Sequence, residues 1–335
     1  MACFYLKSAV VTTLVMLATV GCSAPSANQT SSPASEQTST KVVAVTQIVE
    51  HPSLNATRDG LKQELATAGY QVNKNLKWQW ESAQGNTATA VQIARNFAGE
   101  KPDVIVAIST PSAQAIVSAA SNIPVIFTAV TDPVGAKLVT NQEKPGGWVT
   151  GVSALVPIGK HLDLIAKITP QAKRIGAIYN AGEANSVTLI DLLKQEATTR
   201  GMTIVEATVA GSSEVATAAR SLVGLSDAIY IPTDNTVASA LESVIQIGIN
   251  NKLPVYAADN DSVAKGAIAS LSFNYYDVGR QTAQIVMRVF KGEKPGEIAV
   301  ESPTKLELHV NPKSAQAMGV KIPESVVSEA AKVIQ

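Results

Sequence analysis

The sequence predicts an α/β protein of two similar lobes, each a parallel β-sheet covered by helices, joined by a hinge. From Lys41 onward, short β-branched runs alternate with helical patterns, which is typical of parallel sheets. This pattern occurs twice along the chain. A length of 335 residues gives room for two domains of ordinary size. Hydrophobic residues make up 46% and charged residues 16% of the chain, so its composition is that of a folded protein.

The individual elements follow from the length and period of the apolar patterns. Apolar runs of strand length predict strands at Val42–Thr46, Val104–Ile108, Val125–Thr128, Ile175–Tyr179, Ala228–Ile231, Val255–Ala258 and Ile268–Phe273. Longer amphipathic patterns predict helices at Leu54–Gly69, Thr87–Gly99 and Asn185–Gly201. Trp78 and Trp80 alternate in a further stretch that has the pattern of a strand.

The start of the chain predicts export and attachment to a membrane. Lys7 precedes an apolar run that ends at Val20, which is the form of a bacterial export signal and is too short for a spanning helix of about 20 residues. Thr19-Val20-Gly21-Cys22 resembles the lipobox of bacterial lipoproteins, in which the cysteine is lipidated. We therefore expect a lipoprotein signal peptide over residues 1–22 with lipidation at Cys22. An ordinary signal peptide that is cut elsewhere is the alternative.

The next segment, residues 23–40, has no large apolar side chain and is rich in Ser, Thr and Pro, which predicts a disordered tether. The cysteines, Cys3 and Cys22, both precede it. A catalytic thiol, a disulfide framework and a cysteine-based metal site are therefore not expected in the folded part.

The body of the chain contains an internal duplication. The matching segments, in the same order, are residues 41–70 with 173–202, 102–116 with 226–240, and 122–134 with 252–263. Repetition of this kind indicates two lobes of the same construction.

Parallel sheets of this kind bind ligands beyond the carboxyl ends of their strands. Two lobes that face each other with these loops form a cleft, which is also a natural place for a hinge. The polar and aromatic residues that we expect to line the cleft are Gln47, Glu50, Ser109, Thr110 and Thr128 in the first lobe, and Tyr179, Asn180, Asp234, Asn235, Asp259 and Phe273 in the second part of the chain.

Several of these loops carry a family resemblance. Ile108–Gln114 (ISTPSAQ) and Pro124–Val134 (PVIFTAVTDPV) resemble the ABC-transporter substrate-binding lipoproteins, a family that includes tryptophan- and tyrosine-binding proteins. Thr150–Ser153, Pro232–Thr236 and Asn274–Gln281 continue the pattern, and the resemblance runs from about residue 41 to 330. It implies the type I periplasmic-binding-protein fold, with Rossmann-like lobes joined by three crossovers.

The same resemblance implies where the lobes begin and end. The N-terminal lobe is expected to comprise residues 41–153 and about 277–292, and the C-terminal lobe residues 154–276 and about 293–335. In this arrangement, the helix after Asp277 returns to the first lobe.

The chemistry of the loops suits a zwitterion. Ser109-Thr110-Pro111 has the form of a helix start, which offers free backbone N–H groups to a carboxylate. Thr128 adds a hydroxyl at the end of its strand. Asp234 and Asp259 are expected to hold an ammonium group by charge-assisted hydrogen bonds. Helix capping is the alternative role for Ser109, Thr110 and both aspartates.

The aromatic residues near the cleft are few, since aromatic residues make up only 4% of the chain. Tyr179 and Phe273 are expected to stack on a ring or to wall an apolar pocket. Core packing is favoured for Tyr276 and remains an alternative for the others, Tyr275 included. His51 is expected to contact the rim of the cleft.

Other function classes lack support in the sequence. Lys+Arg 27 balances Asp+Glu 27, so the basic excess that a nucleic-acid binder needs is absent. Dinucleotide-binding, P-loop, zinc-protease and serine-hydrolase motifs are also absent. The three histidines are scattered, which does not suggest a metal cluster. We expect no enzyme, no cofactor and no metal.

The expected function is that of an extracytoplasmic solute-binding lipoprotein of an ABC importer. It would be lipid-anchored to the cell membrane, facing the periplasm or the cell exterior. Its partners would be a small amino-acid-like ligand, possibly aromatic, and an ABC permease with its ATPase. One alternative is a sugar or other polar-solute receptor of the same fold, although no arginine falls in the strand-end loops. Another is a ligand-sensing ectodomain that partners a signalling receptor.

Overall fold

The first sheet begins at β1 (Lys41–Gln47), a buried strand of mainly β-branched residues. The structure is a computed structural model that describes residues 40–335. The predicted signal peptide, the lipidation site Cys22 and the predicted tether up to residue 39 lie outside the described residues.

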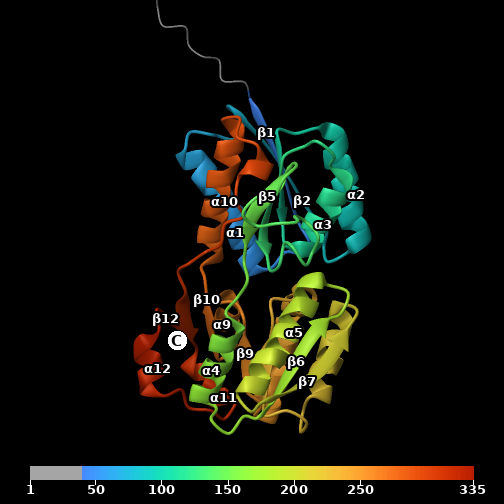
Figure 1. Cartoon of the computed structure of the whole chain (residues 1–335). Coiled ribbons are helices and arrows are strands. Elements are labelled where there is room, and N and C mark those ends of the chain that lie inside the picture. Colours follow the sequence, from blue (N-terminus) through green and yellow to red (C-terminus); the bar gives the residue numbers. More distant parts are fainter. Residues whose placement is uncertain (1–39) are drawn as a thin grey trace, which may run out of the picture. The chain divides into compact units, whose positions relative to one another are not determined.

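The first sheet has five parallel strands in the order β2-β1-β3-β4-β5. Its other strands are β2 (Leu76–Ser82), β3 (Val104–Ile108), β4 (Val125–Val130) and β5 (Val149–Ser153). Its helices are α1 (Pro52–Thr67), α2 (Thr87–Glu100), α3 (Thr110–Ala119) and α10 (Tyr275–Phe290). In Figure 1, α1 and α10 lie together on one side of this sheet, and α2 and α3 on the other. We call this sheet with these helices the first lobe.

The second sheet repeats the order of the first, as β7-β6-β8-β9. Its parallel strands are β6 (Arg174–Asn180), β7 (Thr203–Val209), β8 (Ala228–Ile231) and β9 (Val255–Ala257). Its helices are α4 (Ile158–Ile168), α5 (Ala184–Thr199), α6 (Val215–Ser221), α7 (Asn235–Ala238), α8 (Leu241–Asn251) and α9 (Asp261–Ala264). The shared strand order confirms the duplication that the sequence predicts.

A small third sheet extends the second part of the chain. It pairs β10 (Ala269–Ser272) with β11 (Glu307–Val310) in antiparallel fashion, and β11 with β12 (Lys332–Val333) in parallel. Short helices complete this region: η1 (Ser212–Glu214), η2 (Pro295–Glu297), α11 (Pro312–Ala317) and α12 (Glu324–Glu329). We call the second and third sheets, together with α4 to α9, η1, α11 and α12, the second lobe. The short helix η2 contacts β5 of the first sheet and is not included.

The chain passes between the lobes at three places. It leaves β5 for α4, returns from β10 to α10, and crosses again between η2 and β11. At the last crossing, Glu301 still forms an isolated bridge with Val152 of the first lobe. Three connecting segments allow the lobes to move as bodies about a hinge.

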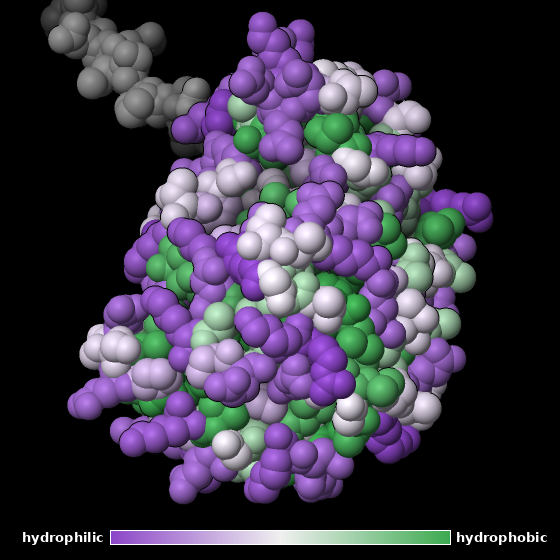
Figure 2. Space-filling model, turned by 60° about the horizontal axis from the view of Figure 1, so that its bottom comes forward, coloured by the Kyte–Doolittle hydropathy of each residue, from purple (hydrophilic) through white to green (hydrophobic). Residues whose placement is uncertain are grey.

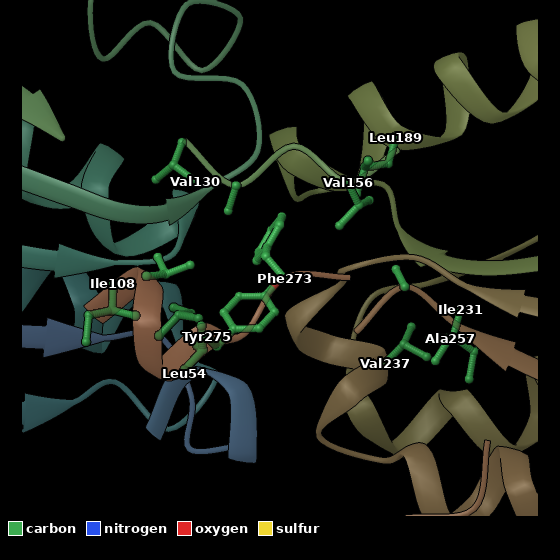
Figure 3. Close-up of a cluster of buried hydrophobic side chains, with 14 of the residues drawn as sticks. Leu54, Ile108, Val130, Val156, Leu189, Ile231, Val237, Ala257, Phe273 and Tyr275 are labelled. Carbon is green, nitrogen blue, oxygen red and sulfur yellow. The ribbon is translucent and has the colours of Figure 1, made fainter. Parts of the chain in front are cut away.

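Apolar side chains fill each lobe and also meet where the lobes face each other. Figure 3 shows Phe273 and Tyr275 between first-lobe residues such as Leu54 and second-lobe residues such as Val156. On the surface, hydrophilic residues cover most of the face in Figure 2, with hydrophobic residues scattered among them. This mixture is ordinary for a folded protein. Among residues 40–335, no helix is both long and apolar enough to cross a bilayer.

One buried histidine ties three elements of the second lobe together. His161 of α4 lies 2.6 Å from the Tyr230 hydroxyl on Nδ1 and 2.7 Å from the Leu271 carbonyl oxygen on Nε2. Because a carbonyl only accepts, Nε2 donates and Nδ1 accepts from Tyr230. Burial lowers the pKa of His161 to about 4, so the ring is neutral at physiological pH.

The closest helix contact joins α1 to α10. A Cβ atom on Gly279 would overlap the backbone carbonyl oxygen of Thr57, and one on Gly60 would overlap that of Tyr276. Only glycine permits this approach of two backbones. The contact fixes α10, which arrives from the second lobe, against the first helix of the first lobe.

We therefore expect Gly279→Ala to lower the free energy of unfolding by about 1–3 kcal/mol, because the added methyl group forces the helices apart. Urea denaturation measures the change. Gly99→Ala in α2 is the matched control, since nothing lies within 4 Å of its Cβ position. The control should gain about 0.5–1 kcal/mol from helix propensity. Equal effects at the two positions would contradict the close helix contact.

Candidate ligand-binding site

A pocket lies between the two lobes, where the strand-end loops of both sheets meet. It is lined by His51, Ser53, Leu54, Thr110, Ala129, Thr131, Ala154, Asn185, Thr233, Asp234, Asn235, Ala238, Asp259 and Tyr275. The lobes are close together here, and the space open to water is about 30 Å³. Small-molecule sites usually measure about 300–1,000 Å³, so the lobes must part to admit a ligand.

A wider groove opens beside the pocket. Its volume is about 1130 Å³, and it runs between α2 and α3 on one side and the loops after β6 and β7 on the other. Pro111 and Thr236 line the groove, while their neighbours Thr110 and Asn235 line the pocket. The groove therefore lies next to the pocket.

The first lobe contributes the start of α3. Ser109, directly before this helix, has a φ of 82°, an unusual value for a residue other than glycine. Its side chain makes no capping hydrogen bond, and the buried hydroxyls of Ser109 and Thr110 have no protein partner. Backbone strain and unsatisfied polar groups occur together at binding sites. The side chains of Ser109 and Thr110 therefore do not cap α3.

Both carboxyl oxygens of Asp234 in the second lobe accept hydrogen bonds from the protein. Its Oδ1 accepts from the backbone N–H of Val237 at 2.8 Å, which caps α7. Its Oδ2 accepts from the Asn180 N–H and from the Ser186 hydroxyl, each at 2.6 Å. Asp234 therefore joins β6, α5 and α7.

A second buried carboxylate, Glu183, stands beside it. Its oxygens accept from the side chains of Asn185, Asn235 and Thr236 and from two backbone N–H groups at the start of α7. Burial, reinforced by the nearby charge of Glu183, raises the pKa of Asp234 to about 7.

Hydrogen bonds also cross the cleft. The Ser53 hydroxyl lies 3.0 Å from Asp259 Oδ1 and 2.9 Å from Asp261 Oδ2, and its single proton serves one of them at a time. Asp259 also accepts from the backbone N–H and the hydroxyl of Ser262. His51 lines the pocket at the start of α1, and burial lowers its pKa to about 4 against the opposing charge of Asp259.

The structure brings some of the predicted site residues together. Thr110, Asp234, Asn235 and Asp259 all line the pocket, and Ser109 adjoins it through the start of α3. His51 lines it as well.

Other predicted site residues lie elsewhere. Gln47 is buried beside α1 and donates to Asn55, while Glu50 is exposed and accepts from Gln84. Thr128 faces α10, where its hydroxyl lies 2.8 Å from that of Thr282.

The remaining ones belong to the second part of the chain. Tyr179 donates to Glu206 at the outer strand β7, because its position in the strand turns it that way. Asn180 lines the groove instead of the pocket. Phe273 is buried and packs on Tyr275, with ring centres 5.1 Å apart.

Sequence reasoning missed several pocket residues. Asn185, Thr233 and Ser53 sit within or beside expected elements, but their residue types gave no specific signal. Tyr275 lines the pocket, whereas Tyr276 is 36% exposed, so the expected core role of Tyr276 is wrong. The start of α10 decides which of the two neighbours faces inward. In the described part of the chain, no group of three or more potential metal ligands occurs.

Comparison with known proteins identifies the family. Residues 42–334 match the ABC transporter substrate binding proteins. The chain belongs to this family. It is 40% identical over 281 residues to a tyrosine-binding protein of Clostridioides difficile (strain R20291), covering 84% of this chain and 81% of that one. Family members are extracytoplasmic substrate-binding receptors rather than enzymes, and they have the type I periplasmic-binding-protein fold that the sequence predicted.

Two solved structures of relatives bear on the arrangement of the lobes. A Streptococcus pneumoniae ABC domain in complex with L-Trp is 35% identical and superposes with a TM-score of 0.86, covering 88% of this chain and all of that one. The ligand-free, open structure of a Clostridium difficile substrate-binding protein is 39% identical, with 88% and 99% covered, yet its TM-score is 0.67. The two relatives are about equally similar to this chain in sequence, at 35% and 39% identity. The difference therefore indicates that the lobes are closed here.

The raised pKa of Asp234 has a consequence for stability. Its carboxyl stays protonated in the fold up to about pH 7, while the unfolded chain loses that proton near the ordinary pKa of 3.8 for aspartate. The protonated Asp234 carboxyl therefore contributes its full stability to the fold below pH 3.8, and this contribution is lost as the pH rises through about 7. In Asp234→Asn this dependence should vanish, so the variant should gain stability relative to wild type between pH 4 and pH 8. A difference that stays constant across this range, measured by urea denaturation, would contradict the assignment.

Proposed function

We propose that this substrate-binding protein captures an aromatic amino acid between its lobes and presents the closed form to the permease of an ABC importer. The moving units are the first lobe, with the chain that follows α10 up to about Glu301, and the second lobe, with the chain from β11 onward. The observation that carries the proposal is a pocket with unpartnered hydroxyls and a helix start on one side, and buried carboxylates on the other. Relatives named for tyrosine binding and solved with L-Trp support the ligand class.

The carboxylate of the ligand binds at the start of α3. The positive end of the helix dipole and the first free N–H groups favour an anion there. The hydroxyls of Ser109 and Thr110 are buried without protein partners and are the polar groups that a carboxylate would satisfy. This end of the ligand belongs to the first lobe.

The ammonium group of the ligand faces the second lobe. Glu183 and Asp259 concentrate negative charge on that side of the pocket, and Asp234 adds to it as its carboxyl loses its proton near pH 7. Their field attracts a cation even where their oxygens already accept hydrogen bonds from the protein. A zwitterion therefore contacts both lobes, and this contact stabilises the closed form over the open one.

The side chain of the ligand lies against apolar groups. Leu54, Ala129, Ala154, Ala238 and Tyr275 supply the apolar part of the lining. Small alanine side chains leave room for a bulky group when the lobes part slightly. The Tyr275 ring, supported by the ring of Phe273, offers an edge or a face to an aromatic ligand.

Calorimetric titration of the purified protein tests this function. L-Tyrosine or L-tryptophan should bind, and Thr110→Val should weaken binding by about 10- to 100-fold, the range for one hydrogen bond to a charged group. Ser118→Ala at the far end of α3 is the matched control, because its hydroxyl only donates within the helix. Binding of sugars but not of amino acids would contradict the proposed ligand class and favour a sugar receptor. Binding of no solute would favour the ligand-sensing ectodomain.

Attachment to the membrane is part of the same proposal. Lipidation of Cys22 would hold the receptor close to the permease, with the following segment as a tether. We expect Cys22→Ser to move the protein from the membrane fraction to the supernatant after ultracentrifugation of cell lysates. Wild type and the Thr110→Val variant should both pellet with membranes. A Cys22→Ser protein that still pellets would contradict lipid anchoring.

A further inference from the structure

The carboxylates on the second-lobe side of the pocket have little capacity left for a ligand. Asp234 already accepts three hydrogen bonds, and Asp259 accepts from Ser53 and twice from Ser262. Glu183 accepts five. Because a carboxylate has about four acceptor sites, Glu183 has none left, and Asp234 and Asp259 keep about one each.

Asn185, at the start of α5, has a hydrogen-bond acceptor that no protein group uses. Its side chain is 4% exposed and lines the pocket, and its Oδ1 has no hydrogen-bond partner in the protein. The neighbouring Thr233 hydroxyl, which also belongs to a pocket-lining residue, is likewise buried without a partner. Buried polar groups without partners are rare in folded proteins, and each needs an explanation.

The orientation of the Asn185 amide is fixed by its surroundings. Its Nδ2 lies 3.1 Å from Glu183 Oε2 and 3.0 Å from the Thr233 carbonyl oxygen. Both are acceptors only, so the nitrogen must occupy that side and the oxygen must occupy the other. Glu183 therefore acts as a positioning residue that turns an acceptor toward the pocket.

Resting on the proposed function, we infer that Asn185 Oδ1 and Thr233 Oγ1 receive the ammonium group of the ligand, and that Asn185 selects for ligands with a free α-amino group. The carboxylates behind them supply the attracting field and hold the amide in place. Neutral oxygens make the contact. An ammonium has three N–H donors, so it satisfies both acceptors and retains one donor.

This arrangement discriminates strongly against analogues without the amino group. Such an analogue leaves the Asn185 oxygen and the Thr233 hydroxyl buried and unsatisfied, and sites built around a hydrogen bond reject ligands that lack the partner group. The ratio of affinities for an amino acid and its des-amino analogue therefore measures the role of Asn185. A purely structural role would leave that ratio unchanged.

The test uses calorimetric titration with L-tyrosine and with 3-(4-hydroxyphenyl)propionate, its des-amino analogue. Wild type should bind L-tyrosine at least about 100-fold more tightly than the analogue. Asn185→Ala should reduce this ratio at least about tenfold by weakening L-tyrosine binding alone, the effect of one lost hydrogen bond to a charged group. Thr198→Ala at the far, exposed end of the same helix α5 should keep the wild-type ratio, because its hydroxyl only donates to the Lys194 carbonyl within the helix.

The outcomes separate the two proposals. A ratio that survives Asn185→Ala, or that falls equally in Thr198→Ala, overturns the inference, while L-tyrosine binding by wild type upholds the proposed function. Failure of wild type to bind L-tyrosine or L-tryptophan overturns both. If Asn185→Ala does not fold, Asn185→Leu, which keeps most of the side-chain volume without the oxygen, gives the same comparison. Glu183→Gln, which frees the amide to turn over, should also lower the ratio.

Discussion

The contact of α1 with α10 is the constraint on which the binding site depends. Gly60 and Gly279 let the two backbones touch, so a helix that comes from the second lobe is held against the first helix of the chain. Both helices begin at the pocket, where α1 presents Ser53 and Leu54 and α10 presents Tyr275. Any shift between these helices would change the first-lobe wall of the site directly.

In the second lobe, buried hydrogen bonds rather than a helix contact hold the pocket wall in place. Glu183 and Asp234 tie together the end of β6 and the starts of α5 and α7 with hydrogen bonds of 2.6 to 3.1 Å in a buried position. Burying two acids so close together costs stability, and the raised pKa of Asp234 reflects that cost. What the fold gains is a rigid frame in which one amide oxygen, that of Asn185, is left free for the pocket.

Much of the fold was predictable, because strand-length apolar runs and the internal repeat depend on local sequence. The Ser109-Thr110-Pro111 loop was predictable for the same reason, since a hydroxyl pair before proline marks a helix start. Capping of α7 by Asp234 was one of its two expected roles, but its bonds to Asn180 and Ser186 were not predictable, because the sequence shows an acid in a loop but not the donors that surround it. Asn185 carries no motif, and its free oxygen exists only because Glu183 and the Thr233 carbonyl take its nitrogen. Tyr179 ends a strand at the cleft, yet the strand turns it toward Glu206.

Closure of the two lobes around a ligand is the central claim, and small-angle X-ray scattering of the purified protein with and without saturating L-tyrosine tests it most directly. The closed arrangement leaves about 30 Å³ in the pocket, so the free protein must spend time open to admit a ligand. We expect L-tyrosine to lower the radius of gyration and to shift the scattering profile toward that calculated for the closed lobes described above. An unchanged profile, in a sample whose L-tyrosine binding is verified by calorimetry, would contradict capture by lobe closure.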